Sequence, residues 1–271
     1  MKNQFIKDHY IPILFYQDKL TNFPSVNYTS LHESVARRKF MKDQFEYFGI
    51  TKTSTYQTER YTEISKNVKF TGTGIKHEYV ILQLGTILSH LNLLRNWYVS
   101  TNEDYAIFCE DDISFESIRY WNFTWDEFIQ NLPKNWECIQ LTKVLSPYSP
   151  TSVSELQLKI QKGRWWGSHS LMKRSYVKKI LDKTCIGYNE YRLDVIKGDI
   201  DYAPIIENLL FVGLGEVYNF PMLIEANNLS TTFLYKPANS DESQVLSYQY
   251  ILKEWQTCGK DLDIKSALSV D

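Results

Sequence analysis

The sequence has little of several features that would mark a particular class of protein. Its 271 residues carry 30 Lys and Arg against 32 Asp and Glu, a formal net charge of −2. This balance argues against a nucleic-acid partner, because a generic polyanion binder needs a concentrated basic surface. No apolar run approaches the roughly 20 residues of a membrane span, and residues 1–9 hold no apolar stretch of signal-peptide length. We therefore expect a cytoplasmic protein without a transmembrane segment.

Cysteine is also scarce. The four cysteines lie far apart in the sequence, with no paired spacing of the kind that binds zinc. Reduced thiols are the natural interpretation in a cytoplasmic compartment. By contrast, the content of hydrophobic residues (43%) and charged residues (23%) is ordinary for a folded globular domain, so extensive disorder is not expected.

Apolar patterning predicts strands that alternate with helices. A first strand is expected at 11–16, and Ser30 with Glu33 form a capping box for a helix that ends at Gly49. Further helices are expected at 80–98, 173–181 and 242–255, and strands at 105–109, 139–141 and 217–220. This order predicts a single α/β domain with a mostly parallel central sheet flanked by helices. We expect the catalytic domain to span 1–235 and a C-terminal helical tail, 236–271, to pack on it.

The residues best suited to catalysis or metal binding follow the apolar segment 105–109. Glu110, Asp111 and Asp112 stand where ligands collect in open α/β sheets, outside the carboxyl end of a strand. Three adjacent carboxylates repel one another unless a cation compensates them, and oxygen ligands suit Mg²⁺ or Mn²⁺. Because residues i and i+2 of an extended chain point the same way, Glu110 and Asp112 are expected to face one metal ion and Asp111 to face elsewhere. The simpler alternative is a solvated or helix-capping acidic turn.

Other segments accompany this acidic motif in a fixed order. They are Arg37-Arg38-Lys39-Phe40-Met41, Gly85 with Ser89-His90-Leu91, Trp166-Gly167-Ser168-His169, and Ile200-Asp201 followed by Gly213 and Pro221. Together with Glu110-Asp111-Asp112 they resemble the motifs of glycosyltransferase family 25, the lipooligosaccharide-biosynthesis and procollagen-galactosyltransferase family. The resemblance covers roughly residues 11 to 230, and the chain departs from the family pattern at Ser168, where threonine is usual.

The resemblance implies a GT-A-type, Rossmann-like fold and an inverting transfer of galactose, glucose or xylose from a UDP-sugar to a hydroxyl of a glycan acceptor. It implies a divalent ion, Mn²⁺ or Mg²⁺, bound mainly by Asp112 with Glu110 or Asp111 assisting. The residues expected to bind the donor are Arg37, Arg38, Glu110, Asp111, Ser168 and His169.

Inversion also requires a carboxylate that takes the proton of the acceptor hydroxyl. Asp201 is the candidate base and Asp199 its alternative, although Asp201 also suits the N-cap of a helix at 202–210. Trp165 and Trp166 are expected to stack on the acceptor sugar or simply to pack. His169 suits a metal ligand, a diphosphate contact or a structural role equally well.

The paired arginines have different expected environments. Arg38 falls on the apolar stripe of its helix and is predicted either to pair with a carboxylate or to reach the nucleotide, with Arg37 as the more exposed neighbour. Two rival functions use the same residues: a metal-dependent phosphodiesterase or other hydrolase, and a non-catalytic sugar-binding module. The hydrolase would need more histidines and acids at other strand ends, and the sequence offers few.

Overall fold

The structure is a computed structural model that describes residues 14–60, 68–71, 77–143, 154–161, 169–187, 190–194, 206–211, 213–226 and 240–270. The predicted acceptor and base residues Trp165, Trp166, Asp199 and Asp201 lie outside these ranges, as do Ser168 and the predicted domain boundary at 235. Among the described residues, no helix has the length and apolar character needed to cross a membrane.

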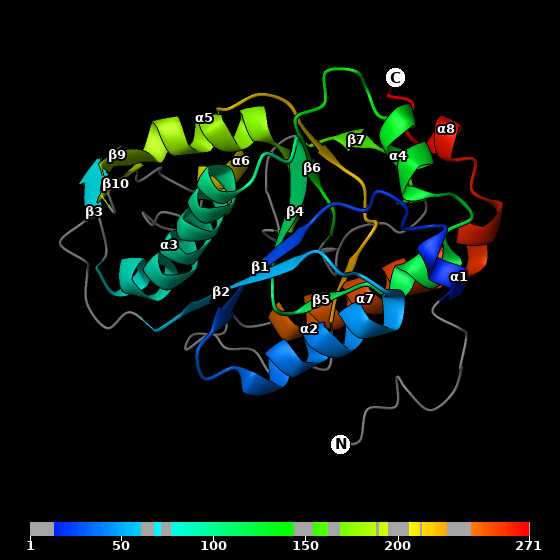
Figure 1. The fold of residues 1–271 in the computed structure, drawn as a ribbon, viewed down its shortest axis with the longest axis horizontal. Helices are drawn as coiled ribbons and strands as arrows, with labels where there is room; N and C mark the ends of the chain where they lie inside the picture. Colours follow the sequence, from blue (N-terminus) through cyan, green and yellow to red (C-terminus); the bar gives the residue numbers. More distant parts are fainter. Residues whose placement is uncertain are drawn as a thin grey trace.

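The described part of the chain forms a seven-stranded mixed sheet with helices on both faces, which confirms the predicted α/β class (Figure 1). The order is β2-β1-β4-β8-β6-β11-β7. Strands β2, β1, β4, β6 and β11 point one way, whereas β8 and β7 run antiparallel to their neighbours. The bounds are β1 Val26–Leu31, β2 Thr53–Thr58, β4 Tyr105–Glu110, β6 Cys138–Gln140, β7 Lys159–Ile160, β8 Ser170–Lys173 and β11 Val217–Asn219.

Two smaller sheets complete the strand inventory of the described residues. Strands β3 (Val68–Thr71), β10 (Glu190–Asp194) and β9 (Cys185–Gly187) form one of them. The other is the pair of β5 (Ile113–Ser114) with β12 (Ile224–Glu225), and it begins directly after the acidic motif.

The sheet separates the apolar core into two clusters, and helices cover each of them. Figure 1 shows α2 and α7 on one side and α3 and α5 on the other. Alternate residues of β4 point into different clusters: Ile107 and Cys109 toward α2 and α7, Ala106 and Phe108 toward α3 and α5. The helices are α1 Leu14–Gln17, α2 Val35–Phe48, α3 His77–Ser100, η2 Glu116–Tyr120, α4 Trp125–Asn131, α5 Arg174–Thr184, α6 Ile206–Phe211, α7 Ser240–Cys258, η3 Gly259–Asp261 and α8 Ile264–Ala267.

The C-terminal helices share the core with the rest of the chain. Trp255 of α7 is buried and donates a hydrogen bond from Nε1 to the carbonyl oxygen of Pro221 at 2.8 Å. The carbonyl oxygen of Ala267 in α8 accepts a hydrogen bond from the amide of Leu158, also at 2.8 Å.

Most of the predicted elements are confirmed, and two predictions near the N-terminus are wrong. Helices predicted at 80–98, 173–181 and 242–255 correspond to α3, α5 and α7, and strands at 105–109, 139–141 and 217–220 to β4, β6 and β11. Residues Leu14 to Tyr16, however, are helical, and Tyr16 packs edge-on against Phe48. The first strand of the sheet is β1, at 26–31.

The capping-box prediction is the second error. Ser30 lies within β1, paired with Gln57 of β2, and α2 begins only at Val35 after Ser34, whose side chain makes no capping hydrogen bond. The predicted end is confirmed: Gly49 adopts the left-handed conformation (φ 72°), and its amide donates to the carbonyl oxygen of Phe45.

Candidate functional site

The acidic motif forms a turn at the carboxyl end of β4. Residues 106–109 of β4 are buried on both faces of the sheet, and the strand ends at Glu110, so Asp111 and Asp112 make the turn into β5. Glu110 pairs with Thr29 near the carboxyl end of the parallel neighbour β1. The carboxylates therefore stand at the sheet edge where ligands bind in open α/β proteins.

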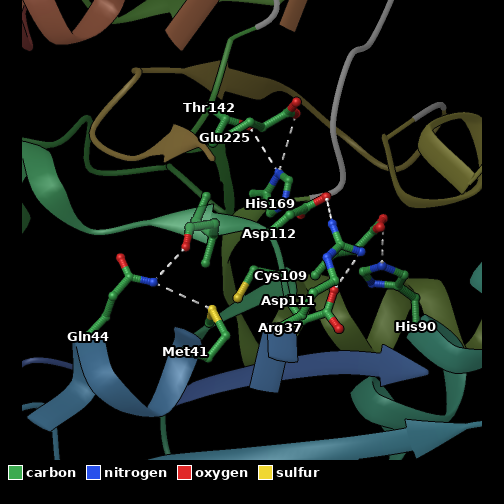
Figure 2. Close-up of polar contacts among 12 residues, drawn as sticks. Arg37, Met41, Gln44, His90, Cys109, Asp111, Asp112, Thr142, His169 and Glu225 are labelled. Atoms are coloured by element: carbon green, nitrogen blue, oxygen red, sulfur yellow. Dashed lines mark hydrogen bonds and ion pairs between the residues drawn. The ribbon is translucent and has the colours of Figure 1, made fainter. Parts of the chain in front are cut away.

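One arginine of α2 contacts both carboxylates of the turn. Nη1 of Arg37 lies 2.9 Å from Oδ1 of Asp111, and Nη2 lies 2.7 Å from Oδ2 of Asp112 (Figure 2). The prediction that Asp111 faces away from Asp112 is therefore wrong, whereas a metal ion shared by Glu110 and Asp112 stays a prediction. Because the strand ends at Glu110, the rule for extended chains no longer applies to Asp112, and the turn directs Asp111 and Asp112 to the same cation.

Burial and charge set the protonation of these two acids in opposite directions. Burial raises the pKa of Asp111 to about 6, with Arg37 opposing the rise. Burial would also raise the pKa of Asp112, but its hydrogen bond with His169 and the charge of Arg37 outweigh this and hold its pKa well below the ordinary value. Asp112 is therefore ionised across the physiological pH range, whereas Asp111 titrates near pH 6.

The burial of Arg37 and Arg38 is the reverse of that expected from the sequence. Arg37, predicted as the exposed neighbour, is 9% exposed, whereas Arg38 is only partly buried. Arg38 binds the chain that leaves β1: it donates to the carbonyl oxygens of Leu31 and, at 2.7 Å, of His32, and to Oγ of Ser30 at 3.2 Å. Arg38 thus fixes the loop between β1 and α2 beside the acidic turn.

His169 lies on the other side of Asp112 and is buried. Its Nε2 is 3.2 Å from Oδ1 of Asp112, and its Nδ1 is 3.2 Å from Oγ1 of Thr142 and 3.8 Å from Oε1 of Glu225 (Figure 2). Burial alone would lower the pKa of His169, but the hydrogen bond to Asp112 and the charges of Asp112, Glu225 and Glu110 outweigh it and raise the pKa to about 9. At neutral pH His169 is therefore a cation between two carboxylates.

Glu110 faces a different partner on α3. Its Oε1 lies 3.5 Å from Nε2 of His90, which is 1% exposed. Burial raises the pKa of Glu110, but the contact with His90 and the charge of His169 outweigh this and lower it below the ordinary value. His90 thus supports the first carboxylate of the motif.

Three residues of the cluster were not predicted as site residues. Thr142 and Glu225 contact His169, and Gln44 of α2 binds the backbone of the segment that follows the turn. Gln44 stands seven residues after Arg37, two turns of helix, so both polar side chains occupy one buried face of α2. That spacing is the signal that would have found Gln44.

The protein would supply only some of the ligands of a divalent ion at this site. Asp112 Oδ1 and His169 Nε2 are 3.2 Å apart, and both could bind one ion only if His169 gave up its Nε2 proton, since a ligating histidine is neutral. Within the described ranges, no group of three or more His, Cys, Asp or Glu side chains is arranged for a metal. Mg²⁺ sites commonly combine one or two protein ligands with phosphate oxygens and water. An ion that takes its remaining ligands from a diphosphate and water stays a prediction for this site.

The chain matches no protein-family model, and no curated protein matches it at a significant level. The site itself is a carboxylate turn at the end of β4, neutralised on one side by Arg37 and on the other by His169.

Proposed function

We propose that this protein is an inverting glycosyltransferase that moves a galactose-, glucose- or xylose-type sugar from a UDP-sugar to a hydroxyl of a glycan acceptor. The main support is the position of the Asp111–Asp112 turn at the carboxyl end of β4, beside β1. The mixed sheet, in which five strands share one direction, is compatible with the GT-A-type, Rossmann-like fold that the sequence resemblance implies.

The donor would bind across the carboxyl ends of β1 and β4, with its diphosphate near Asp112 and its uracil near the end of β1. A divalent ion, when bound, would neutralise negative charge on the departing diphosphate. Asp112 and, after loss of its Nε2 proton, His169 are the described residues that would hold it, and Glu110 or Asp111 stays the predicted assistant.

The protein's own groups have distinct roles in this proposal. Arg37 keeps the carboxylates of Asp111 and Asp112 fixed, and His169 orients the carboxylate of Asp112. Proton removal from the acceptor hydroxyl is assigned to Asp201, with Asp199 as the alternative, and both assignments rest on the sequence alone. The acceptor sugar would stack on Trp165 and Trp166, again on sequence grounds.

Thermal unfolding in the presence of nucleotides tests the proposal without knowledge of the acceptor. UDP, ADP, UDP-galactose, UDP-glucose and UDP-xylose would each be added with and without Mn²⁺. A ligand at 100 times its dissociation constant stabilises the fold by about 2.7 kcal/mol. We expect UDP and at least one UDP-sugar to raise the melting temperature, ADP to raise it less, and Mn²⁺ to enlarge the effect. Equal shifts with UDP and ADP, or none, would refute the donor assignment.

A further inference from the structure

Helix α2 carries a second buried polar side chain to the acidic turn. Gln44, which Figure 2 shows, is 3% exposed, and its amide bonds to two backbone groups. Nε2 donates to the carbonyl oxygen of Ile113 at 3.0 Å, and Oε1 accepts from the amide of Phe115 at 2.8 Å. These groups flank Ser114 on one edge of β5. The side chain therefore bonds to β5 as a neighbouring strand would.

The opposite edge of β5 belongs to β12. Ser114 pairs with Ile224 and Ile113 with Glu225, and the amide of Ala226 donates to the carbonyl oxygen of Asp112 at 2.7 Å. The strand that leaves the turn is therefore held on both edges, by β12 and by Gln44. Because Ile113 directly follows Asp112, the position of β5 sets the position of the Asp112 backbone.

We propose that Gln44 is a positioning residue that holds the Asp111–Asp112 turn in register for donor binding, an inference that rests on the proposed function. Arg37 holds the two carboxylates, and Gln44, two helical turns further along, holds the backbone that follows them. Binding constellations need to be held to within roughly 0.5 Å. A shift of β5 moves the Asp112 carboxylate relative to His169, which faces it at 3.2 Å.

The test compares Gln44→Met with Ser117→Ala. Ser117 is a suitable control because it is buried in η2, and its hydroxyl donates to the carbonyl oxygen of Met222 rather than to β5. Two quantities would be measured: the dissociation constant of UDP in Mn²⁺, and the distance from Asp112 Oδ1 to His169 Nε2 in crystal structures without nucleotide or metal. We expect Gln44→Met to weaken UDP binding about tenfold, or about 1.4 kcal/mol, because the Asp112 carboxylate is no longer fixed where the donor binds. We also expect it to lengthen the distance from Asp112 to His169, which is 3.2 Å in the wild type.

Ser117→Ala should lower the melting temperature but leave both quantities at their wild-type values. If Gln44→Met behaves in the same way, Gln44 is only a structural residue and the proposal fails. If Gln44→Met does not fold, Gln44→Asn keeps the amide on a shorter stem and should shift both quantities in the same direction. If the wild type binds no UDP, the proposed function fails, and the distance from Asp112 to His169 alone decides the role of Gln44.

Discussion

Nη2 of Arg37 lies 2.7 Å from Oδ2 of Asp112, although 75 residues separate the two in the sequence. The same guanidinium contacts Asp111 through Nη1. Adjacent carboxylates need a compensating cation, and the protein supplies one from α2 before any ligand binds. Helix α2 and the acidic turn therefore form a single structural unit at the end of β4.

Replacement of Arg37 should cost much of the stability of the fold. Arg37→Met leaves the buried carboxylate of Asp111 and the partly exposed one of Asp112 without their shared partner, and breaking one side of a buried ion pair typically costs about 3–5 kcal/mol. We expect the free energy of unfolding, measured by urea denaturation at pH 7, to fall by about 3 kcal/mol.

Lys39→Met is the matched control on the same helix. Lys39 forms an exposed i,i+4 pair with Asp43, and its side chain is 69% exposed. Such pairs contribute about 0.5 kcal/mol or less. Equal losses in the two variants would mean that Arg37 makes no more than a surface contact.

The fold could be predicted where a segment was long or its pattern unambiguous. Helix α3 and strand β4 have extended apolar patterns, and the prediction placed both correctly. The short run ending at Tyr16 was misassigned because a few apolar residues suit a buried helix as well as a buried strand. Its aromatic partners on α2, Tyr47 and Phe48, come some thirty residues later, so no local pattern reveals them.

The location of the site was predicted better than the contacts within it. The apolar strand followed by three acids located the turn, but the roles of Arg37 and Arg38 were exchanged. Apolar periodicity marks the buried face of α2 through Met41, Phe45 and Phe48, yet it gives no weight to a buried arginine or glutamine. Those side chains are buried because of acceptors on a distant segment, and a single helix does not encode its partners.

The ion pairing of His169 predicts a specific pH dependence of stability. The folded pKa of about 9 exceeds the ordinary value of 6.5. The stabilisation is therefore complete below the unfolded pKa and is lost as the pH rises through 9. The charged groups that face the ring are Asp112, Glu225 and Glu110. Between pH 7 and 9.5 the wild type should lose about 2 kcal/mol more than His169→Gln. The free energy of unfolding would be measured by urea denaturation at each pH. The same dependence on pH in the two proteins would contradict this account.

The assignment of the general base can be tested separately from donor binding. Loss of such a base typically lowers the rate by about 10²- to 10⁴-fold, whereas donor binding depends on the nucleotide and on Asp112. Asp201→Asn should therefore bind the UDP-sugar like the wild type and lose turnover. Normal turnover by Asp201→Asn together with inactivity of Asp199→Asn would identify Asp199 as the base instead. If both variants remain active, the base is another residue.

The central claim is that the carboxylate of Asp112 serves transfer from a UDP-sugar, and the most direct measurement is UDP release by the wild type and by Asp112→Asn. UDP-galactose, UDP-glucose and UDP-xylose would be supplied in turn with Mn²⁺, and circular dichroism would verify the fold of the variant. We predict Mn²⁺-dependent release of UDP from at least one donor by the wild type, abolished by Asp112→Asn or by a chelator. Full turnover by Asp112→Asn, or by the wild type in the chelator, would contradict the account.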